Sequence, residues 1–132
     1  MARLTIRIDF GNGTAIGPGK VRLLELVDET GSIRKAAGQM KMSYRRGWLL
    51  LKALDGTFGE ALVETATGGR AGGGARLTLA GRLVVKQYRG VEKAATKAAA
   101  RNLAALSASA GVGSTAKKPG IPPAKAKIRK PR

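Results

Sequence analysis

Apolar and polar residues alternate near the start of the chain. Leu4, Ile6 and Ile8 are separated by charged or polar residues, and this period of two predicts a short, half-buried strand that ends at residues 11–13. Further on, apolar residues three or four apart predict a helix that begins at Pro18, whose fixed φ suits a first turn, and ends at Gly31. Its expected inward residues are Val21, Leu23, Leu24 and Val27.

Two short helices are predicted next, joined by a tight turn. Ser32 can cap the first and Ser43 the second, because a serine hydroxyl accepts a hydrogen bond from a backbone N–H of the first helical turn. The inward residues of the first helix are expected to be Ile33, Ala36, Ala37 and Met40. Since small alanines allow two helices to cross closely, the pair predicts a helix-turn-helix.

The second of these helices is expected to run from Tyr44 to about Leu54. Its spacing places Trp48, Leu51 and Leu54 inward, so Trp48 is interpreted as a core residue rather than a base-stacking one. The residues expected on or near its outer side are Tyr44, Arg45, Arg46, Leu49 and Lys52. Leu49 is unusual there: it could contact a thymine methyl or pack on another element, and both interpretations stay open.

A hairpin and a long helix complete the predicted fold. Glycine-rich residues 68–74, which include Arg70, are expected to join strands at residues 62–65 and 75–77 as a wing, and Thr78 can cap a helix that begins at Leu79. The predicted class is α+β and mostly α. It comprises a winged helix-turn-helix with a short N-terminal strand over residues 1–78, a long C-terminal dimerisation helix over residues 79–108 and a disordered basic tail over residues 109–132.

One set of residues in the long helix follows a heptad spacing. Steps of four and three predict a coiled-coil seam, weak because alanines fill its middle, and therefore a homodimer. The seam residues are Val84, Tyr88, Val91, Ala95, Ala98 and Asn102. The alternative is that the start of this helix packs on its own domain and that its alanine-rich end frays.

Charge and composition indicate what the domain binds. The 132 residues include 25 Lys and Arg against 8 Asp and Glu, a formal net charge of +17, with no His or Cys. Without these two residue types there is no disulfide, thiolate nucleophile, His/Cys metal site or imidazole catalyst, so we expect neither an enzyme nor a metal site. The expected partner is a polyanion, double-stranded DNA above all.

Two segments bear on where the protein works. No apolar run is long enough to span a membrane, and the expectation is a cytoplasmic, nucleoid-associated protein with no membrane partner. From Gly111 onward the chain has seven Lys or Arg, no acidic residue and four of its five prolines. This composition predicts the tail, which either contacts nucleic acid or serves as a solubilising extension.

Three segments carry a family resemblance. Gly-Ser-Ile-Arg-Lys-Ala-Ala at 31–37, Met-Ser-Tyr-Arg-Arg-Gly-Trp at 42–48 and the glycine-rich stretch at 62–78 closely resemble the DNA-binding N-terminal domain of ModE, the molybdate-responsive transcription regulators. The helix-turn-helix is also similar to that of LysR-type regulators. The resemblance covers about residues 18–90. It implies a winged helix-turn-helix that dimerises through its long helix, binds a palindromic operator and regulates genes of molybdenum transport or use, with repression expected.

The resemblance has one departure. Family members carry β-barrel domains that bind molybdate, whereas here a basic tail follows the long helix, so no cofactor is expected in this chain and molybdate is implied by the resemblance alone. Residues 99–103 are faintly similar to an oxyanion-binding stretch of those barrels but lack its serine. Two alternatives stay open: a nonspecific nucleoid-type DNA-binding protein, and a DNA-binding subunit that pairs with a separate effector-binding protein.

DNA-contacting residues follow from the geometry of a helix-turn-helix, whose second helix enters the major groove with its N-terminal residues nearest the bases. The predicted base-reading residues are Ser43, Tyr44, Arg45 and Arg46. Those predicted to contact phosphates, or to act from the wing, are Ser32, Arg34, Lys35, Lys52, Arg70 and Arg76. Arg76 has a second interpretation, as a residue of the strand surface.

Overall fold

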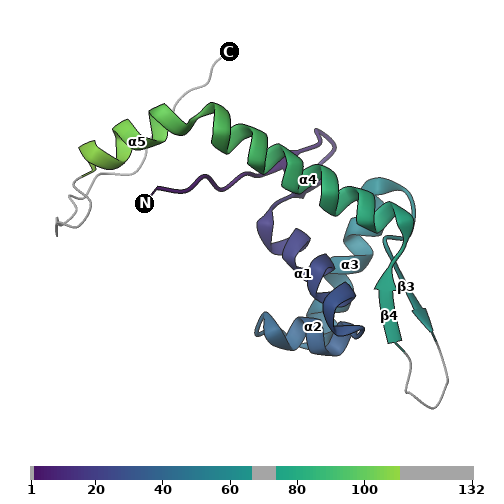
Figure 1. The fold of residues 1–132 in the computed structure, drawn as a ribbon. Helices are drawn as coiled ribbons and strands as arrows, with labels where there is room; N and C mark the ends of the chain where they lie inside the picture. The colour runs from purple at the N-terminus through teal and green to yellow at the C-terminus, as the bar shows by residue number, and fades with distance from the viewer. Residues whose placement is uncertain (1, 67–73, 111–132) are drawn as a thin grey trace. The chain divides into compact units, whose positions relative to one another are not determined.

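The computed structural model describes residues 2–66 and 74–110. Its elements are β1 (Ile8–Asp9), β2 (Ala15–Ile16), α1 (Pro18–Thr30), α2 (Ile33–Gln39), α3 (Tyr44–Phe58), β3 (Val63–Ala66), β4 (Gly74–Leu77), α4 (Leu79–Ala98) and α5 (Ala100–Ser109). The mostly helical α+β class, with helix-turn-helix and wing strands in the predicted order, is confirmed (Figure 1). The wing tip with Arg70 and the predicted tail from residue 111 onward lie outside the described residues.

Residues 4–95 form one compact unit, and α1 lies at its centre. This helix packs against α2, α3 and β4 (Figure 1). Its four expected inward residues, Val21, Leu23, Leu24 and Val27, are fully buried. Helix α5 belongs to a second unit. Among the residues that the structure describes, no helix is both long and apolar enough to cross a membrane.

The N-terminal strand is shorter than its alternating pattern predicts. Leu4, Ile6 and Ile8 are half-buried and the residues between them are exposed, as expected. Only Ile8–Asp9 has a strand partner, the antiparallel Ala15–Ile16. The ladder cannot extend to residue 4 because the partner strand stops before α1 begins at Pro18, which has no backbone N–H to donate.

Both predicted serine caps of the helix-turn-helix are present. The Ser32 Oγ accepts a hydrogen bond from the Lys35 N–H at 3.0 Å, and the Ser43 Oγ accepts one from the Arg46 N–H at 3.1 Å. The helices meet closely where Gly47 of α3 faces Ala37 of α2. A Cβ added at Gly47 would lie 2.9 Å from the Ala37 Cβ, so this crossing requires a glycine.

The prediction that Trp48 is a core residue is wrong. Its side chain is 39% exposed, and α3 instead buries Gly47, Leu51 and Leu54. At about 100° per residue, position 48 lies to one side of the line through 47, 51 and 54. A glycine therefore occupies the place on the inward face that the apolar pattern assigned to tryptophan. Helix α3 is also longer than expected and ends at Phe58, before Gly59 with φ 74°.

The wing strands and α4 are joined at Thr78. Strands β3 and β4 pair antiparallel with Val63 opposite Leu77, and the Thr78 N–H donates to the Leu62 carbonyl at 2.9 Å. The predicted Thr78 cap is present: its Oγ1 accepts from the Gly81 N–H at 3.0 Å.

The predicted long helix over residues 79–108 is not continuous. It breaks at Ala99, where φ is −97° and ψ is 8°, and resumes as α5. Alanine has the highest helix propensity, so the composition predicted continuity. The break lies just beyond Ala95, where the compact unit ends, and sequence propensity has no information on where tertiary packing stops.

An ion-pair cluster ties α4 to α1. The Arg89 guanidinium makes two hydrogen bonds of 3.0 Å to the Glu25 carboxylate of α1 and a third of 2.6 Å to Glu92. Arg22 adds contacts of 3.2 Å to Glu25 and 3.0 Å to Glu29. The hydrogen bonds from Arg89 lower the pKa of Glu25 below its ordinary value, against the raising effect of burial. Ion pairs therefore connect two helices that are far apart in the sequence.

Replacing Glu25 with glutamine should make the protein about 1 kcal/mol less stable at pH 7, a modest figure because the cluster is partly exposed to solvent. A lowered pKa means that the folded state favours the charged form. The contribution of Glu25 to the free energy of unfolding is therefore complete above the ordinary glutamate pKa of about 4.3 and is lost as the pH falls through the lowered pKa of the folded state. Urea unfolding of wild type and Glu25→Gln at pH 7 and pH 3 measures this, and a stability difference equal at both pH values would contradict it.

Candidate nucleic-acid interface

The surface of the helix-turn-helix carries cations without interspersed acids. No Asp or Glu occurs between Glu29 and Asp55, a stretch that includes all of α2 and most of α3. Six exposed cations lie within it: Arg34, Lys35, Lys41, Arg45, Arg46 and Lys52. Among the described residues, Lys52 alone of these six lies within 4.0 Å of a carboxylate, that of Asp55 at 3.5 Å. The positive field here is therefore barely neutralised.

Five of the eight acidic residues of the chain are engaged in contacts within the fold. Glu25, Glu29 and Glu92 belong to the cluster on α1 and α4. The Asp55 Oδ1 accepts a hydrogen bond from the Leu62 N–H at 2.9 Å, and Asp28 accepts a longer one from the Leu77 N–H at 3.4 Å. These carboxylates hold the fold together, which leaves the α2–α3 surface strongly positive.

The four predicted base-reading residues lie together at the N-terminus of α3. Ser43 is committed to its cap, while the side chains of Arg45 and Arg46 are exposed in the first turn. Tyr44 is 41% exposed, and the Arg34 guanidinium of α2 lies over its ring, 4.8 Å from the ring centroid. The two helix starts thus present one continuous surface with an aromatic ring between arginines.

The predicted phosphate-contacting residues are less uniform. Lys35 is exposed in the first turn of α2, while Ser32 is half-buried and engaged as a cap. The Lys52 Nζ lies 5.4 Å from the centroid of the Trp48 ring. The Arg76 Nε donates to the Glu64 carboxylate of the opposite strand at 2.6 Å. Arg76 is therefore a strand-surface ion pair, the second of its two interpretations, and its phosphate contact stays a prediction.

The base of the wing adjoins the starts of both helices. A groove of about 300 Å³ is lined by Ser32 and Arg34 from the start of α2, Tyr44 from α3, and Thr65 and Ala75 from the wing strands. The Ala75 N–H donates to the Gly31 carbonyl at 2.9 Å, which fixes β4 to the start of α2. Among the described residues that line this groove, none is acidic.

Lys41 is a feature of this surface that sequence analysis missed. It occupies the turn between α2 and α3 with φ 58°, the left-handed region. A non-glycine residue there costs roughly 1–2 kcal/mol, and glycine would adopt the same conformation without that cost. The sequence signal was available, because such a turn favours glycine and a lysine stands in its place.

Replacing Lys41 with glycine should stabilise the protein by about 0.5–1 kcal/mol, because relief of the left-handed conformation exceeds the extra chain entropy of glycine. Lys52→Gly is the matched control: the same exchange inside α3 should destabilise by about 1 kcal/mol. Urea unfolding compares the two. If Lys41→Gly proved as destabilising as Lys52→Gly, the turn would not be strained.

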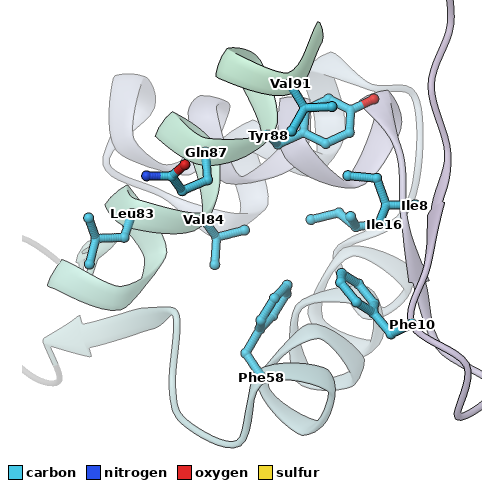
Figure 2. Close-up of a pocket in the computed structure, with 9 residues that line it drawn as sticks. All are labelled: Ile8, Phe10, Ile16, Phe58, Leu83, Val84, Gln87, Tyr88 and Val91. Carbon is cyan, nitrogen blue, oxygen red and sulfur yellow. The ribbon is translucent and has the colours of Figure 1, made fainter. Parts of the chain in front are cut away.

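Helix α4, the N-terminal hairpin formed by β1 and β2, and Phe58 of α3 line an apolar groove. Figure 2 shows side chains of α4 on one side and those of Phe10, Ile16 and Phe58 facing them. The groove has a volume of about 260 Å³. Phe10 and Phe58 make an edge-to-face contact with ring centroids 5.5 Å apart, and Phe10 is still 41% exposed. Leu83 and Val91 are 48% and 42% exposed.

Tyr88 does not fit the predicted heptad seam, because the structure buries it within its own domain. It is 2% exposed, and its hydroxyl donates to the Ile6 carbonyl at 2.6 Å. Val84 is half-buried against the same core, as the alternative interpretation of this helix allowed. Burial also raises the pKa of Tyr88. Of the remaining seam residues, Val91, Ala95 and Ala98 lie in α4, while Asn102 lies beyond the break, in α5.

The stretch at residues 99–103 does not fit an oxyanion site. Residues 100–103 form the first turn of α5, with Arg101 and Asn102 exposed to solvent. An oxyanion site needs several donors converging on one point, and consecutive residues of an exposed helix point in different directions.

Comparison with known proteins agrees with this geometry. Residues 19–82 match the family of bacterial regulatory helix-turn-helix proteins of the LysR type. The chain is 38% identical over 92 residues to the molybdenum transport protein ModE of Azotobacter vinelandii, which covers 70% of this chain and 33% of that protein. It is 40% identical over 83 residues to the molybdenum-pterin-binding protein MopA of Rhodobacter capsulatus, covering 63% and 31%.

The chain thus spans about a third of the length of these relatives. Among solved structures, the CbnR_DBD component of a CbnR_DBD–DNA complex is similar with a TM-score of 0.53 and 24% identity. The likeness covers 67% of this chain and 95% of that one. It shows that the two share a fold.

Proposed function

The chain carries a ModE-family DNA-binding domain with a helix-turn-helix of the LysR type, and we propose that it is a transcription regulator that binds a palindromic operator as a homodimer. The observation that carries the proposal is the cationic surface of α2 and the first part of α3, because residues 30–54 contain no acidic side chain. Its cations match the phosphates of a duplex, and α3 begins with two exposed arginines where a recognition helix contacts bases.

Each part of this surface has a distinct role in the proposal. Arg45 and Arg46 read base edges in the major groove, where arginine bonds bidentately to guanine O6 and N7. Tyr44 and Ser43 support them at the start of α3. Arg34, Lys35, Lys41 and Lys52 contact phosphates, which fix the register of the domain on DNA without reading sequence. Arg70, at the predicted wing tip, reaches an adjacent groove or phosphate.

Selection of preferred duplexes from a random pool, with and without molybdate, tests the proposal. We expect a pseudo-palindromic motif, because two identical domains related by a two-fold axis read inverted half-sites. A pool in which every duplex is bound equally would contradict sequence-specific regulation and favour a nucleoid-type protein. Selection unaffected by molybdate would mean that these residues do not sense molybdate by themselves.

The proposed dimer uses the exposed apolar side of α4. Since Tyr88 is buried in its own domain, we assign the contact to Leu79, Leu83 and Val91, which line one side of α4 and are 67%, 48% and 42% exposed. The groove beside Phe10 can receive side chains of a second copy (Figure 2). Apolar area of this kind is the usual core of an interface between identical subunits.

Replacing Leu83 with aspartate should weaken the dimer at least about tenfold, because a charge would be buried at an apolar contact. Leu49→Asp is a matched control, since Leu49 is 49% exposed on α3 against 48% for Leu83 on α4. Sedimentation equilibrium measures both variants. A Leu83→Asp variant that stays as dimeric as wild type would overturn the assignment of this face.

A further inference from the structure

Leu49 is a large apolar side chain placed on the proposed DNA-contacting side of α3. It is 49% exposed, and the buried residues of the helix, Gly47, Leu51 and Leu54, lie on the opposite side. The structure thereby removes one of the two interpretations that the sequence left open, because Leu49 does not pack into the described core. Trp48, the preceding residue, is also 39% exposed, so Leu49 is not a single scattered apolar residue, and adjoining exposed apolar side chains are typical of interaction sites.

The surroundings of Leu49 are cationic. Arg45 lies one turn before it, Arg46 three residues before and Lys52 three residues after, so each is its neighbour on the helix surface. The Lys52 ammonium covers one face of the adjacent Trp48 ring at 5.4 Å from its centroid. Leu49 is therefore an apolar spot framed by positive charges, in a stretch of chain without an acidic residue.

The positive charges around Leu49 distinguish between its possible partners. A second copy docking through the same face would bring Arg45, Arg46 and Lys52 against their own counterparts, and like charges at an interface cost several kcal/mol. A duplex places phosphates beside the cations and offers one apolar group in the major groove, the 5-methyl of thymine. Charge complementarity therefore favours DNA over a second copy of the chain.

We propose that Leu49 reads the methyl group of a thymine in each half-site. The inference rests on the proposed function, since it requires α3 to lie in the major groove. Leu49 follows Arg45 by four residues, a rise of about 6 Å along the helix, so the thymine lies within about two base pairs of the base that Arg45 contacts. α3 thus combines a polar and an apolar contact with adjacent base pairs.

Thymine-to-uracil scanning of the selected duplex tests this, because uracil lacks the 5-methyl and is otherwise identical. Replacing thymine with uracil at one position of each half-site should weaken binding of the wild-type protein about fourfold, the value for one buried methyl group. The Leu49→Ala variant should bind thymine and uracil duplexes equally. Leu106→Ala, which truncates a 64% exposed leucine of α5, should keep the fourfold difference.

The outcomes separate this inference from the proposed function. If uracil is tolerated at every position while Arg45→Ala still loses base preference, the role of Leu49 is wrong and sequence-specific binding stands. If Leu49→Ala retains the uracil effect, another residue contacts the methyl and the inference is overturned. A change in the oligomeric state of Leu49→Ala without DNA would make this spot a protein interface, which also overturns it. A pool with no preferred motif overturns both proposals.

Discussion

Replacing Arg45 with alanine should reduce the preference for the selected duplex over a scrambled one by about fivefold to more than a hundredfold. A bidentate arginine–guanine contact contributes about 1–3 kcal/mol of discrimination. A scrambled duplex lacks this contact, so the substitution weakens binding to the selected duplex more than binding to the scrambled one. The same is expected for Arg46→Ala. Fluorescence anisotropy with both duplexes at one fixed salt concentration gives the ratio of Kd values directly.

Two control variants separate base reading from general attraction. Lys35→Ala should weaken binding to both duplexes alike and make the log–log dependence of affinity on salt shallower by about 0.9, the value for one phosphate contact. Arg7→Ala removes an arginine that is 3.0 Å from Asp9 in the N-terminal hairpin, and we expect it to leave the preference unchanged. If the Arg45 and Arg46 variants behave like Lys35→Ala, α3 is not the element that reads sequence.

Replacing Gly81 with alanine should destabilise the domain by about 1–2 kcal/mol. A Cβ at this position would lie 2.2 Å from the Leu62 carbonyl oxygen and 3.1 Å from its carbon, and backbone atoms cannot rotate away as a side chain can. Overpacking of this kind costs about 1–3 kcal/mol and occasionally more, which outweighs the gain of about 1 kcal/mol that alanine brings to a helix interior. Helix α4 and the backbone of Leu62, which directly precedes β3, would have to separate.

Gly90 supplies the matched control in the same helix. Nothing lies within 4 Å of a Cβ built there, so Gly90→Ala should stabilise the domain by about 0.5–1 kcal/mol. Urea unfolding of the two variants should therefore give changes of opposite sign. Equal effects at the two positions would mean that Gly81 is not at a close approach of two backbones.

The sequence by itself determined the local structure of this protein. The proline start of α1, the serine caps of α2 and α3 and the Thr78 cap of α4 depend on residues within a few positions of each other, and all are present. The winged helix-turn-helix order followed from the same signals. The excess of positive charge was also readable, because it needs only a count of side chains.

Only the tertiary structure decided which side of a helix meets the core. Trp48 is exposed because Gly47 fills the close crossing with Ala37, and periodicity alone cannot rank two neighbouring positions. Tyr88 is not available to the predicted seam because it is buried in its own domain, where its hydroxyl donates a hydrogen bond to the Ile6 carbonyl, 82 residues away along the chain. The pairing of Arg76 with Glu64 across the wing likewise depends on the register of two strands.

The physical reason is the range of the interactions. Caps, turns and helix periodicity are short-range, so adjacent residues encode them, whereas burial and ion pairing depend on which distant segments come together. Local sequence therefore predicted α3 and the outer position of Leu49 on it, and the packing of α1, α2 and α3 decided that Trp48 joins Leu49 and the arginines on its exposed surface.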